Sequence, residues 1–424
     1  MELATPEQVG FDEQRLGRVT TWLHEQVSSE RLAGCSVMVG RYGKIALSEA
    51  VGFADLERQQ VFSADTIVRI YSMSKAVTTV AAMMLFEEGA FQLDDPVAAF
   101  LPEFSDTPVW RGGDASLTDV EPQHQAFTVR HLMTHTSGLT YGFMHTNVVD
   151  AAHREAKIDF PGAAGSLEEV VKKVAQLPLI CQPGSGWNYS VSTDVLGRLV
   201  EVWSGLSLRD FLLTRVLHPL GMFDTDFHVQ PENHDRFSAL YTPLSGGDMS
   251  SIASSSSNKA DEPSGGLRLQ ESAQQSRFLQ PAQLYSGGGG LTGTIGDYAR
   301  FCQMLLNGGQ FAGTRVLGRK TVEFMRLNHL PDNRDMAAMG QPVWSETSYD
   351  GIGFGLGFAV VINPVKAQIL TSPGEHHWGG AASTFFWLDP TESLFTVFFT
   401  QLMPSSTYPI RRELRTRVYQ ALVD

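Results

Sequence analysis

The chain reads VRIYSMSKAVTTVAAMML from Val68 to Leu85, which places Ser72 and Lys75 three positions apart at the start of an apolar pattern. Positions i and i+3 share one face of a helix, so we expect the Ser72 hydroxyl and the Lys75 amine to lie side by side. The N-terminus of a helix also offers unpaired backbone N–H groups and a positive dipole. A nucleophile, a neighbouring base and an environment that favours negative charge are the minimum for acyl transfer.

The residues behind Lys75 predict the helix itself. Apolar side chains recur at helical spacing and predict a single apolar face, and Gly89 is expected to end the helix; they are Val77, Val80, Ala81, Met84 and Leu85. A second Ser-x-x-Lys, from Ser256 to Lys259, lies in a polar segment with no apolar helix behind it. Because nothing there would desolvate the lysine, we interpret Ser72 as the candidate nucleophile. No serine has the Gly-x-Ser-x-Gly pattern of α/β-hydrolases.

Composition excludes several classes of protein. The chain has 424 residues, of which 42% are hydrophobic and 18% charged, as in a globular protein larger than one compact domain. Its net charge of −14, without a Lys/Arg-rich run, argues against a nucleic-acid partner. No apolar run has the length of a membrane span, and the N-terminal residues lack the pattern of a signal peptide. We therefore expect a cytoplasmic protein with no nucleic-acid or membrane partner.

The residues that could hold a metal are few. The three cysteines, Cys35, Cys181 and Cys302, lie far apart and predict neither a disulfide framework nor a metal site. His131 and His135 have helical spacing, but the Glu of a His-Glu-x-x-His site is missing between them. We expect no metal and no organic cofactor.

Strand-like segments occur at both ends of the chain, and short helical patterns fill the middle. This order predicts an α+β fold in which one antiparallel sheet, built from both chain ends, is flanked by helices. We expect residues 1–75 and 290–424 to form a discontinuous sheet domain, and residues 76–289 to form a mainly helical inserted domain. Within the latter, the Ser- and Gly-rich composition near residues 245–280 predicts a flexible loop, either a solvated insertion or a flap that gates the substrate.

A set of motifs follows Ser72 in a characteristic order. They are Ser72-Met73-Ser74-Lys75, His135-Thr136-Ser137-Gly138-Leu139, Tyr189-Ser190-Val191, Gly288-Gly289-Gly290-Leu291 and Trp378-Gly379-Gly380. Together they resemble the serine β-lactamase and penicillin-binding-protein-like family on its class C side, and most closely the family VIII carboxylesterases. The resemblance covers nearly the whole chain, and it implies the β-lactamase-like fold.

The resemblance also implies roles for particular residues. Ser72 matches the acyl-forming nucleophile, Lys75 its partner base, and Tyr189 the tyrosine of the Tyr-x-Asn motif. A neighbouring ammonium favours a phenolate, so Tyr189 beside Lys75 could exchange a proton with Ser72 and the leaving group. The oxyanion donors would be the backbone N–H groups of Ser72 and of Ala381, which we expect on the strand after Trp378.

Two departures from the family pattern bear on the substrate. The Tyr-x-Asn asparagine is Val191 here, and the Lys-Thr-Gly motif is replaced by Trp378-Gly379-Gly380. The missing lysine is the cation that meets a β-lactam carboxylate, so an indole in its place favours neutral esters and leaves Lys75 as the main cation near Tyr189. The residues expected to bind substrate are Trp378, Gly379, Gly380, His377 and Tyr141.

These features predict a serine carboxylesterase that hydrolyses short-chain acyl esters through an acyl-enzyme, with weak hydrolysis of cephalosporins as a further hypothesis. Its partner would be a small-molecule ester. The alternatives within the fold are a β-lactamase, a D-amino-acid peptidase or amide hydrolase, and an acyltransferase. A non-catalytic penicilloyl sensor, which is acylated without turnover, is the alternative outside enzymes.

Overall fold

The computed structural model describes residues 1–244, 265–340, 349–405 and 407–424. Its main feature is an eight-stranded sheet with the order β12-β13-β14-β15-β16-β1-β2-β3, in which every neighbouring pair is antiparallel. The strands are β1 (Gly34–Arg41), β2 (Lys44–Asp55), β3 (Gln60–Val61), β12 (Ile352–Phe354), β13 (Ala359–Val361), β14 (His376–Gly379), β15 (Phe385–Asp389) and β16 (Leu394–Thr400). The sheet is therefore built from both ends of the chain, and the predicted fold class is confirmed.

The two ends of the chain meet where β16 pairs with β1. The register runs from Cys35 opposite Thr400 to Arg41 opposite Leu394. In the sheet, β15 pairs with β16, and β14 pairs with β15. The long-range pairing of β16 with β1 therefore determines where β14, which contains Trp378, lies.

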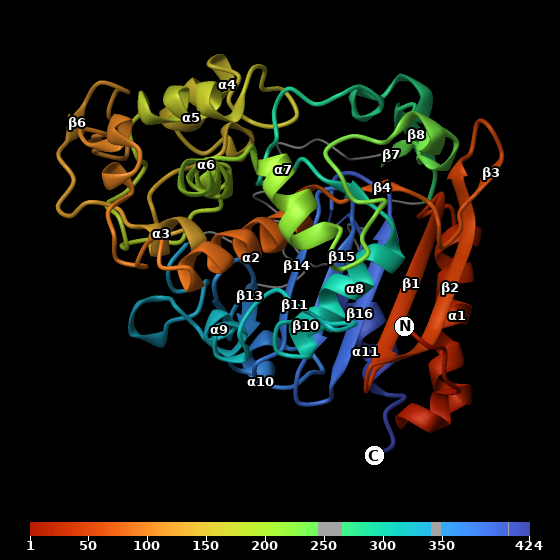
Figure 1. The fold of residues 1–424 in the computed structure, drawn as a ribbon. Coiled ribbons are helices and arrows are strands. Elements are labelled where there is room, and N and C mark those ends of the chain that lie inside the picture. Colours follow the sequence, from red (N-terminus) through yellow and green to blue (C-terminus); the bar gives the residue numbers. More distant parts are fainter. Residues whose placement is uncertain (245–264, 341–348, 406) are drawn as a thin grey trace.

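The alternation of side chains along each strand creates two cores. In β15, Phe385 and Trp387 belong to the core beneath α1 (Glu13–Ser28) and α11 (Ile410–Tyr419). Phe386 and Leu388 point to the opposite face, toward the core that contains α2 (Ser74–Glu87) and α8 (Ile295–Leu306). Figure 1 shows α8 against β16, and α1 beside β2 at the edge of the molecule.

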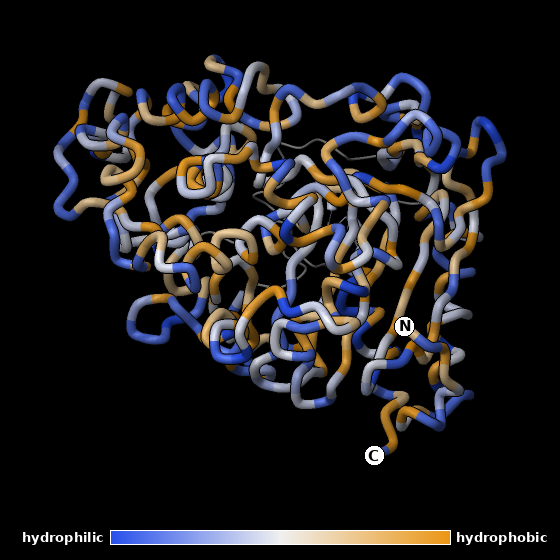
Figure 2. The backbone as a smooth tube through the Cα atoms, viewed as in Figure 1, coloured by the Kyte–Doolittle hydropathy of each residue, from blue (hydrophilic) through white to orange (hydrophobic). Residues whose placement is uncertain are grey.

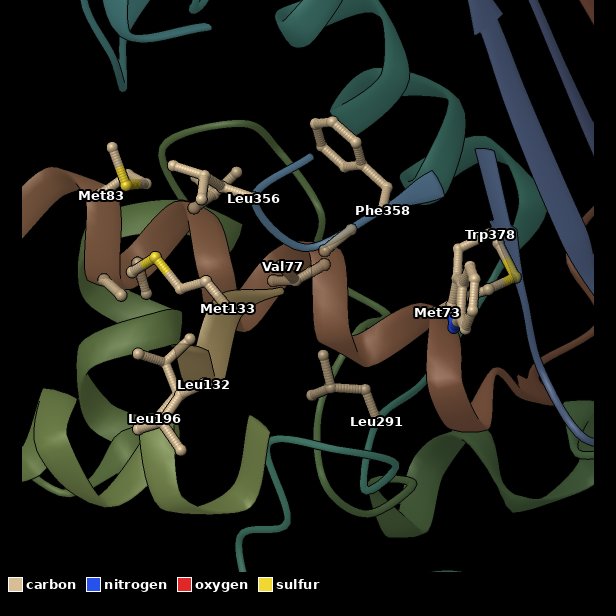
Figure 3. Packing of buried hydrophobic residues seen from close by; sticks show 14 of the residues in the cluster. Met73, Val77, Met83, Leu132, Met133, Leu196, Leu291, Leu356, Phe358 and Trp378 are labelled. Atoms are coloured by element: carbon tan, nitrogen blue, oxygen red, sulfur yellow. The ribbon is translucent and has the colours of Figure 1, made fainter. Parts of the chain in front are cut away.

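Helix α2 is enclosed on every side. All residues from Ser74 to Leu85 are buried, so the prediction of a single apolar face is wrong. A helix that is apolar all round is one that other elements surround. Figure 3 shows these neighbours, among them Leu132, Met133, Leu196, Leu291, Leu356 and Phe358.

The helical part of the chain covers α2 on the side away from the sheet (Figure 1). Its helices are α3 (Val129–Met133), α4 (Val148–Glu155), α5 (Leu167–Ala175), α6 (Ser192–Ser204) and α7 (Leu208–Leu212), and α2 packs against α6. The limits of the two domains at residues 75 and 290 stay a prediction.

Short strand pairs and helices complete the described chain. The pairs are β4 (Val68–Arg69) with β9 (Thr292–Gly293), β5 (Val109–Trp110) with β6 (Val120–Glu121), β7 (Leu240–Pro243) with β8 (Leu267–Glu271), and β10 (Gln310–Phe311) with β11 (Thr314–Arg315). The remaining α-helices are α9 (Arg319–Met325) and α10 (Pro364–Ala367). Hydrophilic segments lie mostly at the periphery of the view in Figure 2.

Of the loop expected near residues 245–280, the described residues from 265 onward contain regular structure. Strand β8 pairs with β7, and 3₁₀ turns cover Ala273–Gln275 and Arg277–Leu279, so the prediction is wrong for these residues. The sequence did not predict strand β8, because the strand is mostly exposed and its segment is polar. Ser256 and Lys259 lie outside the described residues. Among the residues that the structure does describe, no helix has both the length and the apolar character needed to cross a membrane.

Candidate active site

Ser72 sits in a strained turn that precedes α2. Strand β4 leads into a 3₁₀ turn, Tyr71–Met73, and the α-helix starts only at Ser74. Tyr71 has a φ of 42°, a left-handed conformation that is costly for a residue with a side chain. The backbone N–H of Ile70 donates to the Leu291 carbonyl at 3.2 Å, which ties the turn to the segment before β9. The neighbouring structure thus holds Ser72 just outside the helix.

The side chains of Lys75 and Tyr189 both meet the Ser72 hydroxyl. The Lys75 Nζ donates to Ser72 Oγ at 3.3 Å, and the Tyr189 Oη donates to the same oxygen at 2.6 Å. The structure therefore brings together the three residues that the sequence proposed as catalytic, although 117 positions separate Ser72 from Tyr189.

The Lys75 amine is buried among polar partners. Its Nζ donates to the Gly288 carbonyl at 2.6 Å and to the Tyr141 Oη at 3.1 Å. Burial lowers the pKa of Lys75 to about 7, while the negative charge of Asp194 acts in the opposite direction. Near neutral pH a substantial fraction of Lys75 is thus the free amine, which can accept a proton from Ser72.

Tyr189 does not have the character that the sequence suggested. Burial raises its pKa, and the hydrogen bond to Ser72 opposes this only in part, so the side chain is a neutral phenol. The Lys75 Nζ lies over the Tyr189 ring, 4.6 Å from its centroid. The expectation of a phenolate is therefore wrong, because the loss of water around the buried oxygen outweighs the nearby cation.

The expected oxyanion donors come together through a close backbone approach. Ala381 lies in the turn between β14 and β15, not on a strand as expected. A Cβ at Gly380 would come within 2.4 Å of the Ile70 carbonyl oxygen, so only glycine lets this turn approach the Ser72 segment. The backbone N–H groups of Ser72 and Ala381 have no hydrogen-bond partner within the described part of the chain. Both can therefore donate to a substrate oxyanion.

Two pockets meet at this pair of donors. Ser72 and Ala381 line both of two neighbouring pockets that open to solvent. Of the residues expected to bind substrate, the first pocket contains His377, Trp378, Gly379 and Gly380. The second contains Tyr141, together with Phe143 and Phe160.

Neighbouring residues fix the walls of the first pocket. The Trp378 ring lies 5.5 Å from the Tyr189 ring and 5.3 Å from the Phe354 ring, measured between centroids. His377 Nδ1 lies 2.8 Å from a carboxylate oxygen of Glu375, which also pairs with Arg415. The indole that replaces the family's lysine is thus part of the aromatic packing around Tyr189.

A cation that sequence reasoning missed faces the same pocket. Arg411 lines it, and a Cβ at Gly379 would come within 2.5 Å of one guanidinium nitrogen. Its charge acts to lower the pKa of Tyr189 and of His377. Arg411 is therefore a second cation near Tyr189, in addition to Lys75, and the interpretation of Lys75 as the main one stays a prediction. The sequence does contain Arg411, Arg412 and Arg415 at the start of the C-terminal helix, but it does not reveal that this helix begins beside β14.

The remaining histidines and cysteines have structural surroundings. His131 Nδ1 accepts from the Thr128 backbone N–H and so caps α3. His135 Nδ1 lies 3.1 Å from Ser190 Oγ, and its ring packs 5.1 Å from the Tyr189 ring. The described residues contain no group of His, Cys, Asp and Glu that could hold a metal, and the three cysteines are free.

Comparison with known proteins identifies the family. A model of the beta-lactamase family matches residues 19–420. The chain belongs to the beta-lactamase family. It is 32% identical over 386 residues to Protein Rv1367c of Mycobacterium tuberculosis, covering 90% of this chain and 89% of that one. It is 30% identical over 406 residues to Esterase EstB of Burkholderia gladioli, covering 95% and 94%.

A solved structure agrees with this assignment. EstCE1, described as a hydrolase with promiscuous acyltransferase activity, superposes with a TM-score of 0.76 at 26% identity, covering 96% of this chain and 99% of that one. These similarities confirm the β-lactamase-like fold and the resemblance to family VIII esterases. The chain is a serine hydrolase of this family.

The buried Lys75 amine predicts a specific pH dependence. Lys75 accepts the Ser72 proton only as the free amine, and its pKa of about 7 is the midpoint of that change. We expect kcat/KM for a p-nitrophenyl ester, measured between pH 5 and 9, to rise with pH through a midpoint near the same value and then level off. A profile that still rises toward the ordinary pKa of lysine, about 10.4, would contradict this role.

Proposed function

We propose that this chain is a serine carboxylesterase that hydrolyses short-chain acyl esters through a covalent acyl-enzyme. The observation that carries the proposal is the convergence on one oxygen, Ser72 Oγ, of a low-pKa amine from Lys75 and a neutral phenol from Tyr189. The backbone N–H groups of Ser72 and Ala381 add the donors that an ester oxyanion needs.

Acylation begins when Ser72 Oγ attacks the ester carbonyl carbon and its proton passes to the free amine of Lys75. The carbonyl oxygen, now negatively charged, is held by the N–H groups of Ser72 and Ala381. As the bond to the alcohol breaks, Tyr189 donates its phenolic proton to the leaving oxygen, and Lys75 replaces that proton. The products of this step are the free alcohol and an acyl ester of Ser72.

Deacylation repeats these steps with water. A water molecule attacks the acyl carbonyl, loses its proton to the Lys75–Tyr189 pair and forms a second oxyanion at the same donors. Collapse of this intermediate releases the carboxylic acid and returns the proton to Ser72 Oγ. All the proton transfers use groups that already contact Ser72 in the structure.

Esters fit the pocket better than β-lactams. Val191 replaces the asparagine that binds the acylamino group of a lactam, and Trp378 replaces the lysine that meets its carboxylate. Arg411 supplies a different cation against Gly379, which supports weak hydrolysis of cephalosporins as a side activity. The name of EstB, an esterase, supports the same assignment for this chain.

Parallel kinetics on a short-chain p-nitrophenyl ester and a chromogenic cephalosporin test the proposal. We expect the higher kcat/KM for the ester. For the cephalosporin, kcat/KM of the Arg411→Met variant should fall about tenfold or more, because the carboxylate of this substrate loses a charged hydrogen-bond donor. For the neutral ester, kcat/KM should fall much less. Arg319→Met is the matched control, since Arg319 is exposed and pairs with Glu323 on α9, and it should alter neither activity.

The other outcomes reject the assignment in distinct ways. A higher kcat/KM for the cephalosporin would make the chain a β-lactamase. Acylation by both compounds without turnover of either would indicate a penicilloyl sensor.

Transfer of the acyl group to an alcohol is a second candidate activity. Two pockets border Ser72 and Ala381, and an alcohol in one of them and an acyl chain in the other would both lie beside Ser72. The acyltransferase activity named for EstCE1 supports this candidate.

Product analysis distinguishes transfer from hydrolysis. With a p-nitrophenyl ester as donor and benzyl alcohol as acceptor, transfer predicts a benzyl ester whose share of the product rises with alcohol concentration. Free acid as the sole product at every alcohol concentration would exclude the transferase.

A further inference from the structure

Asp194 is a buried carboxylate beside the catalytic residues that the steps above do not use. It lies near the start of α6, five positions after Tyr189, and its side chain is 6% exposed. Its Oδ1 accepts from the Ser286 hydroxyl at 2.6 Å and from the Gly288 backbone N–H at 3.1 Å. A buried carboxylate is costly unless hydrogen bonds and a counter-charge compensate for lost water.

Gly288 connects this carboxylate to the base. Its N–H donates to Asp194, and its carbonyl oxygen accepts from Lys75 Nζ at 2.6 Å. A Cβ at this position would lie 2.6 Å from the other Asp194 oxygen and 2.9 Å from the Tyr141 hydroxyl. The backbone of Gly288 thus fits between Asp194 and Tyr141, and the position of Asp194 determines where the carbonyl meets the amine.

The charges around Lys75 point to the same residue. The groups that contact the Lys75 amine are Ser72, Tyr141 and Tyr189. The neutral His135 and the carboxylate of Asp194 interact with it electrostatically. The charge of Asp159 influences the pKa of both Tyr141 and Asp194. Burial lowers the pKa of Lys75, and Asp194 is the group whose charge raises it. Burial raises the pKa of Asp194, while the Ser286 hydrogen bond, the charge of Lys75 and the Gly288 hydrogen bond favour its charged form.

We propose that Asp194 is a positioning residue for the reaction: it holds the Gly288 carbonyl against the Lys75 amine, and its negative charge offsets the burial of that amine. The inference rests on the proposed role of Lys75 as the base. Without the carboxylate, Lys75 would release its proton at lower pH and would be a weaker base once deprotonated.

The test is the pH dependence of kcat/KM for a p-nitrophenyl ester in Asp194→Asn. This variant keeps an oxygen for the Gly288 N–H but removes the charge. We expect the acid limb to move to lower pH than in the wild type. We also expect the plateau to fall by less than the ~10²–10⁴-fold that the loss of a general base costs.

A control variant separates charge from structure. Asp297→Asn replaces a buried carboxylate on α8 that accepts from Thr225 and the Asp224 backbone, and it should leave the acid limb at the wild-type pH.

The outcomes are distinguishable. A lower plateau with an unmoved acid limb in Asp194→Asn would overturn the proposal, because loss of packing alone produces that result. If circular dichroism shows that this variant is unfolded, Asp194→Ser takes its place, because it removes the charge with a smaller side chain. The acid limb of Asp194→Ser must then move to lower pH. An acid limb that stays at the wild-type pH in this variant overturns the proposal. A wild-type profile without a limb near pH 7 would instead reject Lys75 as the base, and this inference with it.

Discussion

The burial of one amine is the constraint on which the site depends. Lys75 lies in a helix that the core surrounds on every side, so its side chain can reach only the few polar atoms that the fold places beside it. Loss of water makes the amine a proton acceptor near neutral pH, which a lysine on the surface is not. The same burial keeps Tyr189 protonated and therefore able to donate.

The reacting groups come from segments that are far apart in the chain. Ser72 and Lys75 belong to the start of α2, Tyr189 precedes α6, and Ala381 follows β14. Pairing of β16 with β1 places β14 in the sheet, and the absence of a side chain at Gly380 lets the next turn touch the Ser72 segment. The oxyanion donors thus depend on the sheet, whereas the proton-transfer groups depend on the helical part that packs on α2.

The sequence predicted the elements that periodicity and motifs define. The helix that follows Ser72 and the sheet built from both chain ends follow from local patterns and their order. The motifs selected Ser72, Lys75 and Tyr189, and the structure brings their side chains together.

What the sequence did not reveal depends on long-range packing. The expectation of a phenolate at Tyr189 was wrong because the depth at which this side chain is buried is not a local property of the sequence. Arg411 was missed because only the fold shows that α11 begins beside Gly379. Strand β8 was missed because its partner β7 lies across a polar segment, and an exposed strand has no strong apolar pattern.

The central claim is that Ser72 is the nucleophile, and mass spectrometry after reaction with a serine-reactive fluorophosphonate tests it most directly. The account predicts one adduct per chain, on the peptide that contains Ser72, with loss of esterase activity in proportion to labelling. It also predicts no adduct in Ser72→Ala, and normal labelling in Ser256→Ala. An adduct on Ser256 or another serine, or inactivation without labelling of Ser72, would contradict it.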